Sequence, residues 1–275
     1  MTKQSDEYLF SSSQEADRLQ MQSRVWEDEA EALFDRIGVQ RGWHCADLGC
    51  GAMGVLGCLS RRVGDTGRVV GVELDPQLVA AAQAYIQAED LSNVEGFQGD
   101  AYHTELPSNS FDLTHVRFVL APVGRNEEML HEMLGLTRPG GVIVLEEPIS
   151  DTFYPYPPNG AWGRLVEAIY KAAEGLGGDF YVGKRLYALL RQEGLEDVQV
   201  RPVVKTFRNG HPYMRLPIIV ASQPALRQRI IDTGLMSAAV LVETISEVEH
   251  MVQDLEVLLV SFVLMQVWGR KPQSS

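Results

Sequence analysis

The sequence predicts an α/β protein with a mostly parallel central sheet and helices on both of its faces. Three observations predict this class. Short apolar runs alternate with longer segments in which apolar residues recur every three or four positions, as in alternating strands and helices. Glycine-rich turns separate many of these segments. Asp47 and Glu73 stand at the ends of the first two apolar runs, where a doubly wound sheet places groups that bind ligands.

The elements of the first half follow in order along the chain. An amphipathic helix is expected over residues 13–37, because apolar side chains recur on one of its faces. The apolar runs after it are expected to form parallel strands joined by right-handed crossovers. These strands cover 43–48, 68–74, 94–98, 111–116 and 142–146, and the helices between them cover 54–63, 77–89 and 126–136.

The pattern becomes less regular in the second half. Aromatic residues and prolines fill 153–158, which favours a stiff loop that presents flat apolar surface. Residues 212–258 are helical and amphipathic and precede the last strand. The other expected elements are helices at 162–176 and 182–193 and strands at 196–204 and 259–268.

Length and composition limit the possible functions. The 275 residues suffice for one α/β domain and an additional segment, and 45% hydrophobic with 22% charged residues is ordinary for a globular protein. A net charge of −13 repels phosphate backbones, so no nucleic-acid partner is expected. No apolar run reaches the ~18 residues of a membrane span. Three cysteines without zinc-ligand spacing, in a chain without a signal peptide, favour a reduced, cytoplasmic protein with no metal site.

The glycine turn formed by Gly49, Gly51 and Gly54 directly follows the first strand. Glycine permits a positive φ and a close approach of a ligand, and the following helix offers free N–H groups to an anion. With Glu73 about 20 residues further on, the spacing fits a dinucleotide fingerprint. Asp47 favours a different ligand, because its carboxylate suits an ammonium group. S-Adenosylmethionine joins an amino-acid end to ribose and adenine, so this ligand and a nicotinamide dinucleotide both stay open at this point.

The stretch Asp47-Leu48-Gly49-Cys50-Gly51 resembles the first motif, Asp/Glu-x-Gly-x-Gly, of the class I S-adenosylmethionine-dependent methyltransferases. It is most similar to the small-molecule enzymes of the ubiquinone/menaquinone-biosynthesis-like group. The resemblance implies a Rossmann-like, seven-stranded, mostly parallel sheet with an antiparallel last strand, and a helical cap formed by insertions. Other phrases similar to this family are Gly99-Asp100-Ala101, Leu106-Pro107 with Ser110-Phe111-Asp112, and Pro139-Gly140-Gly141.

The same resemblance assigns residues to the cofactor, S-adenosyl-L-methionine. Glu73 is expected at the ribose hydroxyls and Asp100 at the exocyclic amine of adenine, with a ring nitrogen on the next backbone N–H. The cofactor-binding residues that it implies are Asp47, Gly49, Gly51, Glu73, Leu74, Asp100 and Ala101.

Two other parts of the expected cofactor site have alternative interpretations. Arg117, at the end of the fourth strand, can reach the carboxylate of the cofactor, an acidic group of the substrate, or a partner in a surface ion pair. The N-terminal helix either packs on the edge of the sheet or covers the cofactor as a lid. In the lid arrangement, which related methyltransferases use, Tyr8, Arg18 and Gln22 face the cofactor.

The expected division of the chain follows these elements. Residues 1–40 form an N-terminal helical lid, and the other ranges alternate between the core and the cap. They are 41–150 for the cofactor-binding core, 151–180 for a cap segment, 181–204 for a core helix and strand six, 205–258 for the helical cap insertion, and 259–275 for the last core strand and tail.

The predicted activity is methyl transfer by in-line displacement to a small, fairly apolar acceptor, such as a secondary metabolite or a quinone-like molecule. A positioned base would remove a proton from an acceptor that carries one. Glu147, His115 and Tyr154 are the preferred candidates for this base, and His103 and His211 are further candidates. A homodimer is compatible with the sequence.

Three alternative functions stay open. A nicotinamide-dependent oxidoreductase shares the glycines and Glu73 but leaves Asp47 and Gly99-Asp100-Ala101 without a role. A non-catalytic S-adenosylmethionine-binding protein would keep the cofactor motifs beside a pocket too small for an acceptor. A protein or nucleic-acid methyltransferase would show an open cleft with a basic rim.

Overall fold

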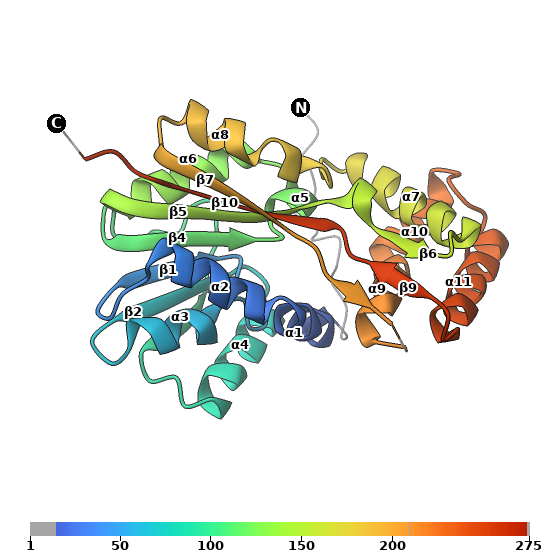
Figure 1. The fold of residues 1–275 in the computed structure, drawn as a ribbon, viewed down its shortest axis with the longest axis horizontal. Coiled ribbons are helices and arrows are strands. Elements are labelled where there is room, and N and C mark those ends of the chain that lie inside the picture. Colours follow the sequence, from blue (N-terminus) through green and yellow to red (C-terminus); the bar gives the residue numbers. More distant parts are fainter. Residues whose placement is uncertain (1–14, 209, 274–275) are drawn as a thin grey trace.

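The structure is a computed structural model that describes residues 15–208 and 210–273. Its centre is a seven-stranded sheet with the strand order β3-β2-β1-β4-β5-β10-β7 (Figure 1). The first five strands are mutually parallel, and β10 runs antiparallel to both β5 and β7. The predicted fold class is therefore confirmed. The strands are β1 (His44–Leu48), β2 (Arg68–Glu73), β3 (Val94–Gln98), β4 (Phe111–Arg117), β5 (Thr137–Ile149), β7 (Glu196–Val203) and β10 (Val263–Arg270).

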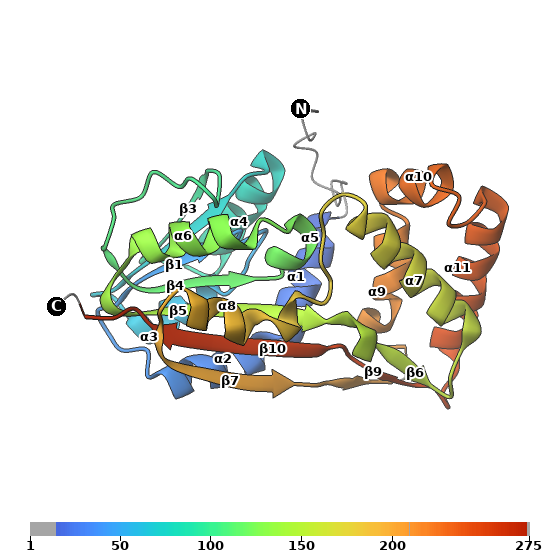
Figure 2. The same ribbon diagram turned by 90° about the horizontal axis from the view of Figure 1, so that it is seen from above.

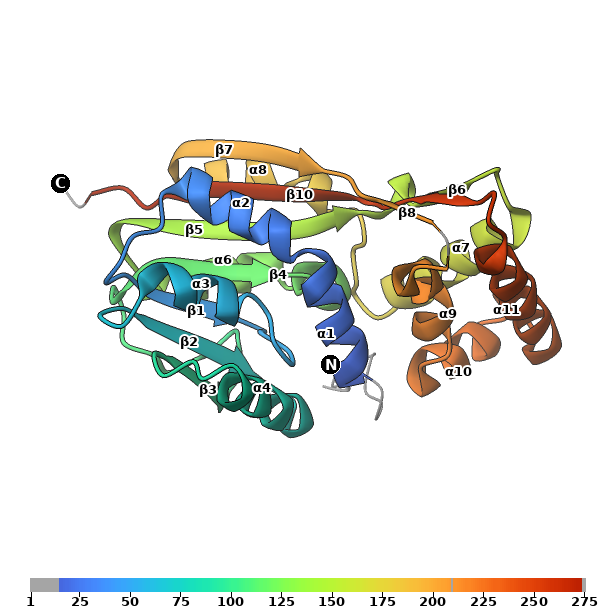
Figure 3. The same cartoon turned by 60° about the horizontal axis from the view of Figure 1, so that its bottom comes forward.

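Helices cover both faces of this sheet, because each crossover leaves a helix with one apolar stripe to bury. One buried cluster joins α2 and α3 to β1, β2 and β5, and a second joins α6 and α8 to the opposite face. Figure 3 shows α2 and α3 in front of the sheet and α6 behind it. The helices are α2 (Glu27–Ile37), α3 (Leu56–Val63), α4 (Pro76–Ala88), α6 (Asn126–Leu136) and α8 (Leu186–Gln192), with a short α5 (Leu120–Val123).

The strand order reverses next to β1, whose neighbours are β2 on one side and β4 on the other. Chain connections leave such a switch point in opposite directions, so a crevice opens at the carboxyl ends of the strands. The glycine turn follows β1 at this place, as the sequence predicted.

The N-terminal segment corrects one expectation. In place of a single helix over 13–37, α1 (Glu15–Val25) and α2 are separated at Trp26, whose φ of −103° and ψ of 9° depart from helical values. The Trp26 side chain is fully buried. Its indole N–H donates to the hydroxyl of Tyr213 at 3.1 Å, and its ring stacks on Phe262 at 5.5 Å between centroids. This anchoring lets α2 lie on the sheet while α1 turns towards the carboxyl ends of the strands.

A second group of helices lies beyond the carboxyl ends of the strands (Figures 1 and 2). The largest buried cluster of the protein joins these helices to Trp26 and Phe262. We call them the cap helices: α7 (Gly160–Glu174), α9 (Leu216–Ala221), α10 (Pro224–Asp232) and α11 (Ala238–Gln253). The described residues also form three short 3-10 turns, at Ser150–Thr152, Val182–Lys184 and Pro212–Arg215.

A small antiparallel sheet at the base of the cap was not predicted. It has the order β6-β9-β8 and comprises β6 (Tyr154–Tyr156), β9 (Leu258–Val260) and β8 (Thr206–Phe207). The aromatic and proline-rich segment is thus partly a strand. The expected last strand, 259–268, is two strands that belong to different sheets. No helix in the described part of the chain is both long and apolar enough to cross a bilayer.

Candidate functional site

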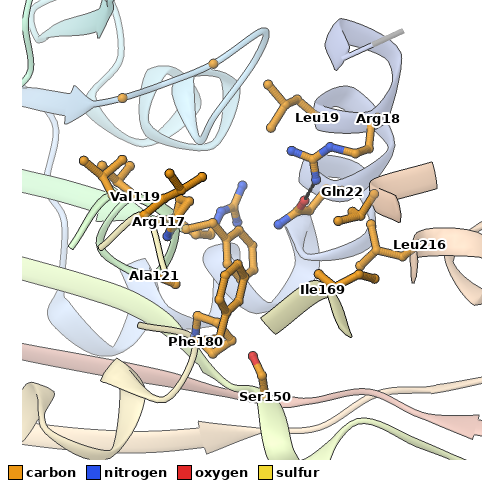
Figure 4. A pocket seen from close by; sticks show the side chains of 18 of the residues that line it. Arg18, Leu19, Gln22, Arg117, Val119, Ala121, Ser150, Ile169, Phe180 and Leu216 are labelled. Atoms are coloured by element: carbon orange, nitrogen blue, oxygen red, sulfur yellow. Dashed lines mark hydrogen bonds between the residues drawn. The ribbon is translucent and has the colours of Figure 1, made fainter. Parts of the chain in front are cut away.

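A cavity of about 960 Å³ lies at the carboxyl ends of the strands, between the sheet and the cap helices. Figure 4 shows side chains converging on it from three sides. Arg117, Val119 and Ala121 come from the end of β4 and from α5, Arg18 and Gln22 come from α1, and Ile169 and Leu216 come from the cap helices. The cavity therefore touches parts of the chain that are far apart in sequence.

The glycine turn forms one wall of the cavity. Gly49, Gly51 and Gly54 all have positive φ, at 72°, 58° and 52°. A side chain at Gly54 would collide with the Asp47 carboxylate. The positive φ and this close contact both require glycine at position 54. Asp47 is buried, lines the cavity, and accepts a hydrogen bond through Oδ2 from the Val55 N–H at 3.0 Å. The carboxylate thereby fixes the path from β1 into α3.

Glu73, at the end of β2, closes the same turn from the other side. Its carboxylate accepts hydrogen bonds from the N–H groups of Gly51 at 2.9 Å, Leu74 at 2.8 Å and Asp75 at 3.0 Å. Burial raises the pKa of Glu73, and these three N–H groups counteract that rise. Glu73 and Leu74 both line the cavity, and Leu74 is half exposed.

Asp100 and Ala101 line the cavity beyond the end of β3. One Asp100 oxygen accepts from the Tyr102 N–H at 2.9 Å, which holds this turn in shape. Asp47, Glu73 and Asp100, from three adjacent strands, therefore share one end of the cavity, as the motifs predicted. The three carboxylates are acceptors, so they suit a ligand that presents N–H and O–H donors.

The α1 helix brings Arg18 and Gln22 to the cavity opposite the sheet (Figure 4). The Arg18 guanidinium donates to both carboxylate oxygens of Glu15, at 2.8 and 2.6 Å, and to the Gln22 side-chain oxygen at 2.6 Å. These contacts hold the two side chains on the part of α1 that lines the cavity. Tyr8, the third residue expected on the lid, lies outside the described residues.

The candidate base His115 is not exposed to the cavity. Its side chain is fully buried between two carboxylates, with Nδ1 2.7 Å from Asp47 Oδ1 and Nε2 2.9 Å from Glu146 Oε1. Burial alone would lower the pKa of His115, but the two carboxylates outweigh it and raise the pKa to about 9. An imidazolium that holds both carboxylates cannot take a proton from an acceptor.

The other candidate bases are also placed away from an acceptor. Glu147 is fully buried and accepts from the N–H groups of Val119, Leu120 and Ala121 at 2.8, 2.7 and 3.2 Å. Burial raises the pKa of Glu147 to about 8. Tyr154 is 52% exposed on β6 and does not line the cavity. His103 pairs with Glu128, and His211 is the cap residue before the 3-10 turn at Pro212–Arg215; neither histidine lines the cavity.

The cap side of the cavity carries residues that the sequence reasoning missed. Five are aromatic, and Phe118 among them has a positive φ of 59°, which turns the chain after β4. No local pattern marks these side chains, because they meet only through the packing of the cap helices on the sheet. They are Phe118, Phe153, Ile169, Tyr170, Phe180, Leu216 and Phe262, and the hydroxyl of Tyr170 donates to the Ser150 carbonyl oxygen at 3.4 Å.

The chain is similar to known methyltransferases in both sequence and structure. Residues 45–141 match the family model described as "Methyltransferase domain". A demethylmenaquinone methyltransferase of Geobacillus kaustophilus is 27% identical over 184 residues, which cover 62% of this chain and 79% of that protein. The corresponding protein of Listeria welshimeri is 26% identical over 192 residues, covering 69% and 78%.

Solved structures agree on the fold. A putative methyltransferase of Bacillus halodurans superposes with a TM-score of 0.61 at 18% identity, covering 88% of this chain and 99% of that one. An Aquifex aeolicus structure described as a SAM-dependent methyltransferase gives a TM-score of 0.52 at 19% identity, covering 68% and 91%.

The fold, the glycine turn and the matched domain support a class I S-adenosylmethionine-dependent methyltransferase. Within this class the chain resembles the menaquinone type of enzyme. The cofactor is S-adenosylmethionine, and the site fits it: the glycine turn leaves room where a Cβ would intrude, and three carboxylates face one end of the cavity. The resemblance inferred from the motifs is thus confirmed.

Proposed function

We propose that the enzyme methylates a small, fairly apolar acceptor with a quinone-like ring system, bound between the cofactor and the cap helices. One observation carries this proposal. The cavity continues from the polar glycine turn into a wall of aromatic and aliphatic side chains, including Phe153, Tyr170 and Phe180. Flat aromatic side chains suit a flat apolar ligand. The curated relatives named as demethylmenaquinone methyltransferases support a quinone-like ring.

The proposed cofactor contacts use the donors and acceptors of the chain. Asp47 accepts from an ammonium group, Glu73 from ribose hydroxyls, and Asp100 from the adenine amine, while the backbone N–H of Ala101 donates to a ring nitrogen. Gly49, Gly51 and Leu74 lie against the cofactor and make van der Waals contacts with it. Arg18 and Gln22 cover it from α1, so the division of the chain into lid, core and cap belongs to this proposal.

The bound cofactor supplies an activated methyl group, and the protein positions the acceptor relative to it. The cap helices and the end of β4 orient the acceptor and exclude water from the cavity. Holding two reactants in line in this way can contribute on the order of 7–11 kcal/mol to the lowering of the barrier. The volume of about 960 Å³ lies at the upper end of the range of about 300–1,000 Å³ for small-molecule sites, which leaves room for both reactants.

The alternatives fit the cavity less well. A protein or nucleic-acid acceptor needs an open cleft, whereas α7, α9 and α10 overhang this one. A nicotinamide reaction would leave the Asp47 carboxylate at the cavity without a ligand group to bind. The cytoplasmic location and the homodimer stay predictions.

The test is turnover with purified protein and isotopically labelled S-adenosylmethionine. We expect methylation of reduced naphthoquinones that carry a free ring position or hydroxyl, and none of unfolded polypeptide or RNA. Phe180→Ala is expected to weaken acceptor turnover, whereas Tyr156→Ala, on an exposed aromatic residue outside the cavity, is the matched control. Methylation of polypeptide or RNA, with no reaction on any aromatic small molecule, would contradict the proposal.

A further inference from the structure

Arg117 brings a buried positive charge with unused hydrogen-bonding capacity to the wall of the cavity. It is the last residue of β4, and only 9% of its surface is exposed. Nη2 donates to the Gly54 carbonyl oxygen at 3.1 Å. Nη1 is buried and has no hydrogen-bond partner among the described residues. Figure 4 shows the side chain on the side of the cavity that faces α1 and the cap helices.

The acidic groups near Arg117 are already engaged. Asp47 and Glu146 flank His115, and the second oxygen of each carboxylate accepts from another N–H group. In residues 15–208 and 210–273, no ion pair joins Arg117 to a carboxylate. With His115 protonated, two carboxylates, one imidazolium and one guanidinium balance one another in this buried group. An anionic ligand oxygen can therefore approach Arg117 without displacing a partner.

A guanidinium in this position is costly unless a ligand completes its contacts, because a buried charge loses hydration and a buried donor needs an acceptor. Arg18, on the opposite wall, differs in that Glu15 already pairs with it. Arg117 also lies at the junction of the two halves of the cavity. One of its nitrogens contacts the glycine turn, and its guanidinium carbon lies 5.9 Å from the ring centroid of Phe118 in the aromatic wall.

We propose that Nη1 of Arg117 is a subsite for one anionic oxygen of a bound ligand. Two reactants can supply this oxygen: the carboxylate at the amino-acid end of the cofactor, or an ionised hydroxyl or carboxylate of the acceptor. The second source rests on the proposed function and would define the acceptor as an acidic aromatic molecule. Such an acceptor releases its proton to water before it binds, so it needs no base in the cavity, consistent with the enclosure of His115 and Glu147.

The experiment compares wild type with Arg117→Met and Arg117→Lys by calorimetric titration. The cofactor arm uses S-adenosylhomocysteine and its decarboxylated analogue, which differ only in the carboxylate. The acceptor arm, at saturating S-adenosylhomocysteine, uses 2-hydroxy-1,4-naphthoquinone, which is ionised at neutral pH, and its neutral 2-methoxy counterpart. Arg68→Met removes an equal charge from an exposed ion pair with Glu95 and is the matched control.

A loss of roughly tenfold to a hundredfold in Arg117→Met, confined to the carboxylate-bearing or ionised member of one pair, is expected for a charged hydrogen bond. The affected pair identifies the source, and Arg117→Lys should recover part of the loss.

Two results would overturn the proposal. One is unchanged binding of all four probes in Arg117→Met. The other is an equal loss within both pairs, which would show that Arg117 serves the structure of the cavity and not a ligand charge. If wild type binds neither naphthoquinone, that result counts against the proposed acceptor, and the cofactor arm alone decides the role of Arg117.

Discussion

The two walls of the cavity are built by different means. The glycine-turn wall is polar, and its shape depends on short-range contacts: Glu73 binds three backbone N–H groups, and Asp47 binds Val55. The cap wall is apolar, and its side chains meet only because α7 and α9 pack against Phe262 and Trp26. The first wall tolerates little change in backbone or charge, whereas the second can be reshaped by substituting side chains. Cofactor recognition is accordingly local in sequence, and acceptor recognition is not.

The largest effect is expected from Gly54→Ala. Its Cβ would collide with the Asp47 carboxylate, lie 2.9 Å from the Cys50 carbonyl oxygen, and occupy a backbone with φ of 52°. We expect loss of S-adenosylhomocysteine binding and a free energy of unfolding lower by roughly 1–3 kcal/mol. Gly135→Ala, inside α6 with nothing within 4 Å of the added Cβ, is the control and should stabilise by about 0.5–1 kcal/mol. Calorimetric titration and urea unfolding would measure both, and normal binding by Gly54→Ala would refute the tight turn.

The cap wall predicts a different pattern for Phe180→Ala. Phe180 lines the cavity and stacks on Tyr170 at 5.1 Å between ring centroids. Loss of this surface should lower kcat/KM for an aromatic acceptor by roughly tenfold or more, since burying a large apolar side chain against a ligand is worth about 1.5–3 kcal/mol. S-Adenosylhomocysteine affinity should stay within about twofold. Equal losses for the acceptor and the cofactor product would show that the two walls do not act separately.

Glu147 predicts a pH dependence of stability. Its pKa is about 8 in the folded protein, against about 4.3 in an exposed glutamate. Because the folded-state pKa is raised, the fold favours the protonated form, and the free energy of unfolding falls as the pH rises from about 4 to about 8. Glu147→Gln cannot ionise and should gain up to a few kcal/mol relative to wild type between pH 5 and pH 8. Urea unfolding at both pH values tests this, and a difference that does not change with pH would contradict it.

The smallest effect on ligand binding is expected where α1 leaves α2. Tyr213→Phe removes the acceptor of the buried Trp26 indole N–H, which should cost about 1–3 kcal/mol of stability. The redirected α1 carries Arg18 and Gln22, so S-adenosylhomocysteine affinity should fall slightly as well. Tyr187→Phe, on a half-exposed tyrosine of α8, is the control. Unchanged stability in Tyr213→Phe would mean that Trp26 does not hold the junction.

Much of the polar wall was predictable because strand ends and turn chemistry are local. Asp47, Glu73 and Asp100 each follow an apolar run, and parallel strands bring their carboxyl ends to one edge. Whether the candidate bases reach the cavity was not predictable in this way. Adjacent residues of a strand point to opposite faces, so Glu146 reaches His115 while Glu147 reaches the N–H groups of α5. Position at the end of a strand therefore does not establish access to the cavity.

The cap could be anticipated only as helical sequence. Which side chains face the cavity depends on the break at Trp26 and on the division of the last strand between two sheets. Both features result from contacts between residues more than 100 positions apart, such as Trp26 with Tyr213 and Val263 with Thr152. A local pattern of apolar residues carries no information about such contacts.

The most direct test of the division between the two walls is a titration of S-adenosylhomocysteine into wild type, Glu73→Gln and Phe180→Ala under identical conditions. Glutamine keeps one acceptor oxygen for the N–H groups around Glu73 but removes the charge and the second acceptor oxygen. The account predicts a loss of roughly tenfold or more in Glu73→Gln and near wild-type affinity in Phe180→Ala. Full affinity in Glu73→Gln together with a large loss in Phe180→Ala would contradict it.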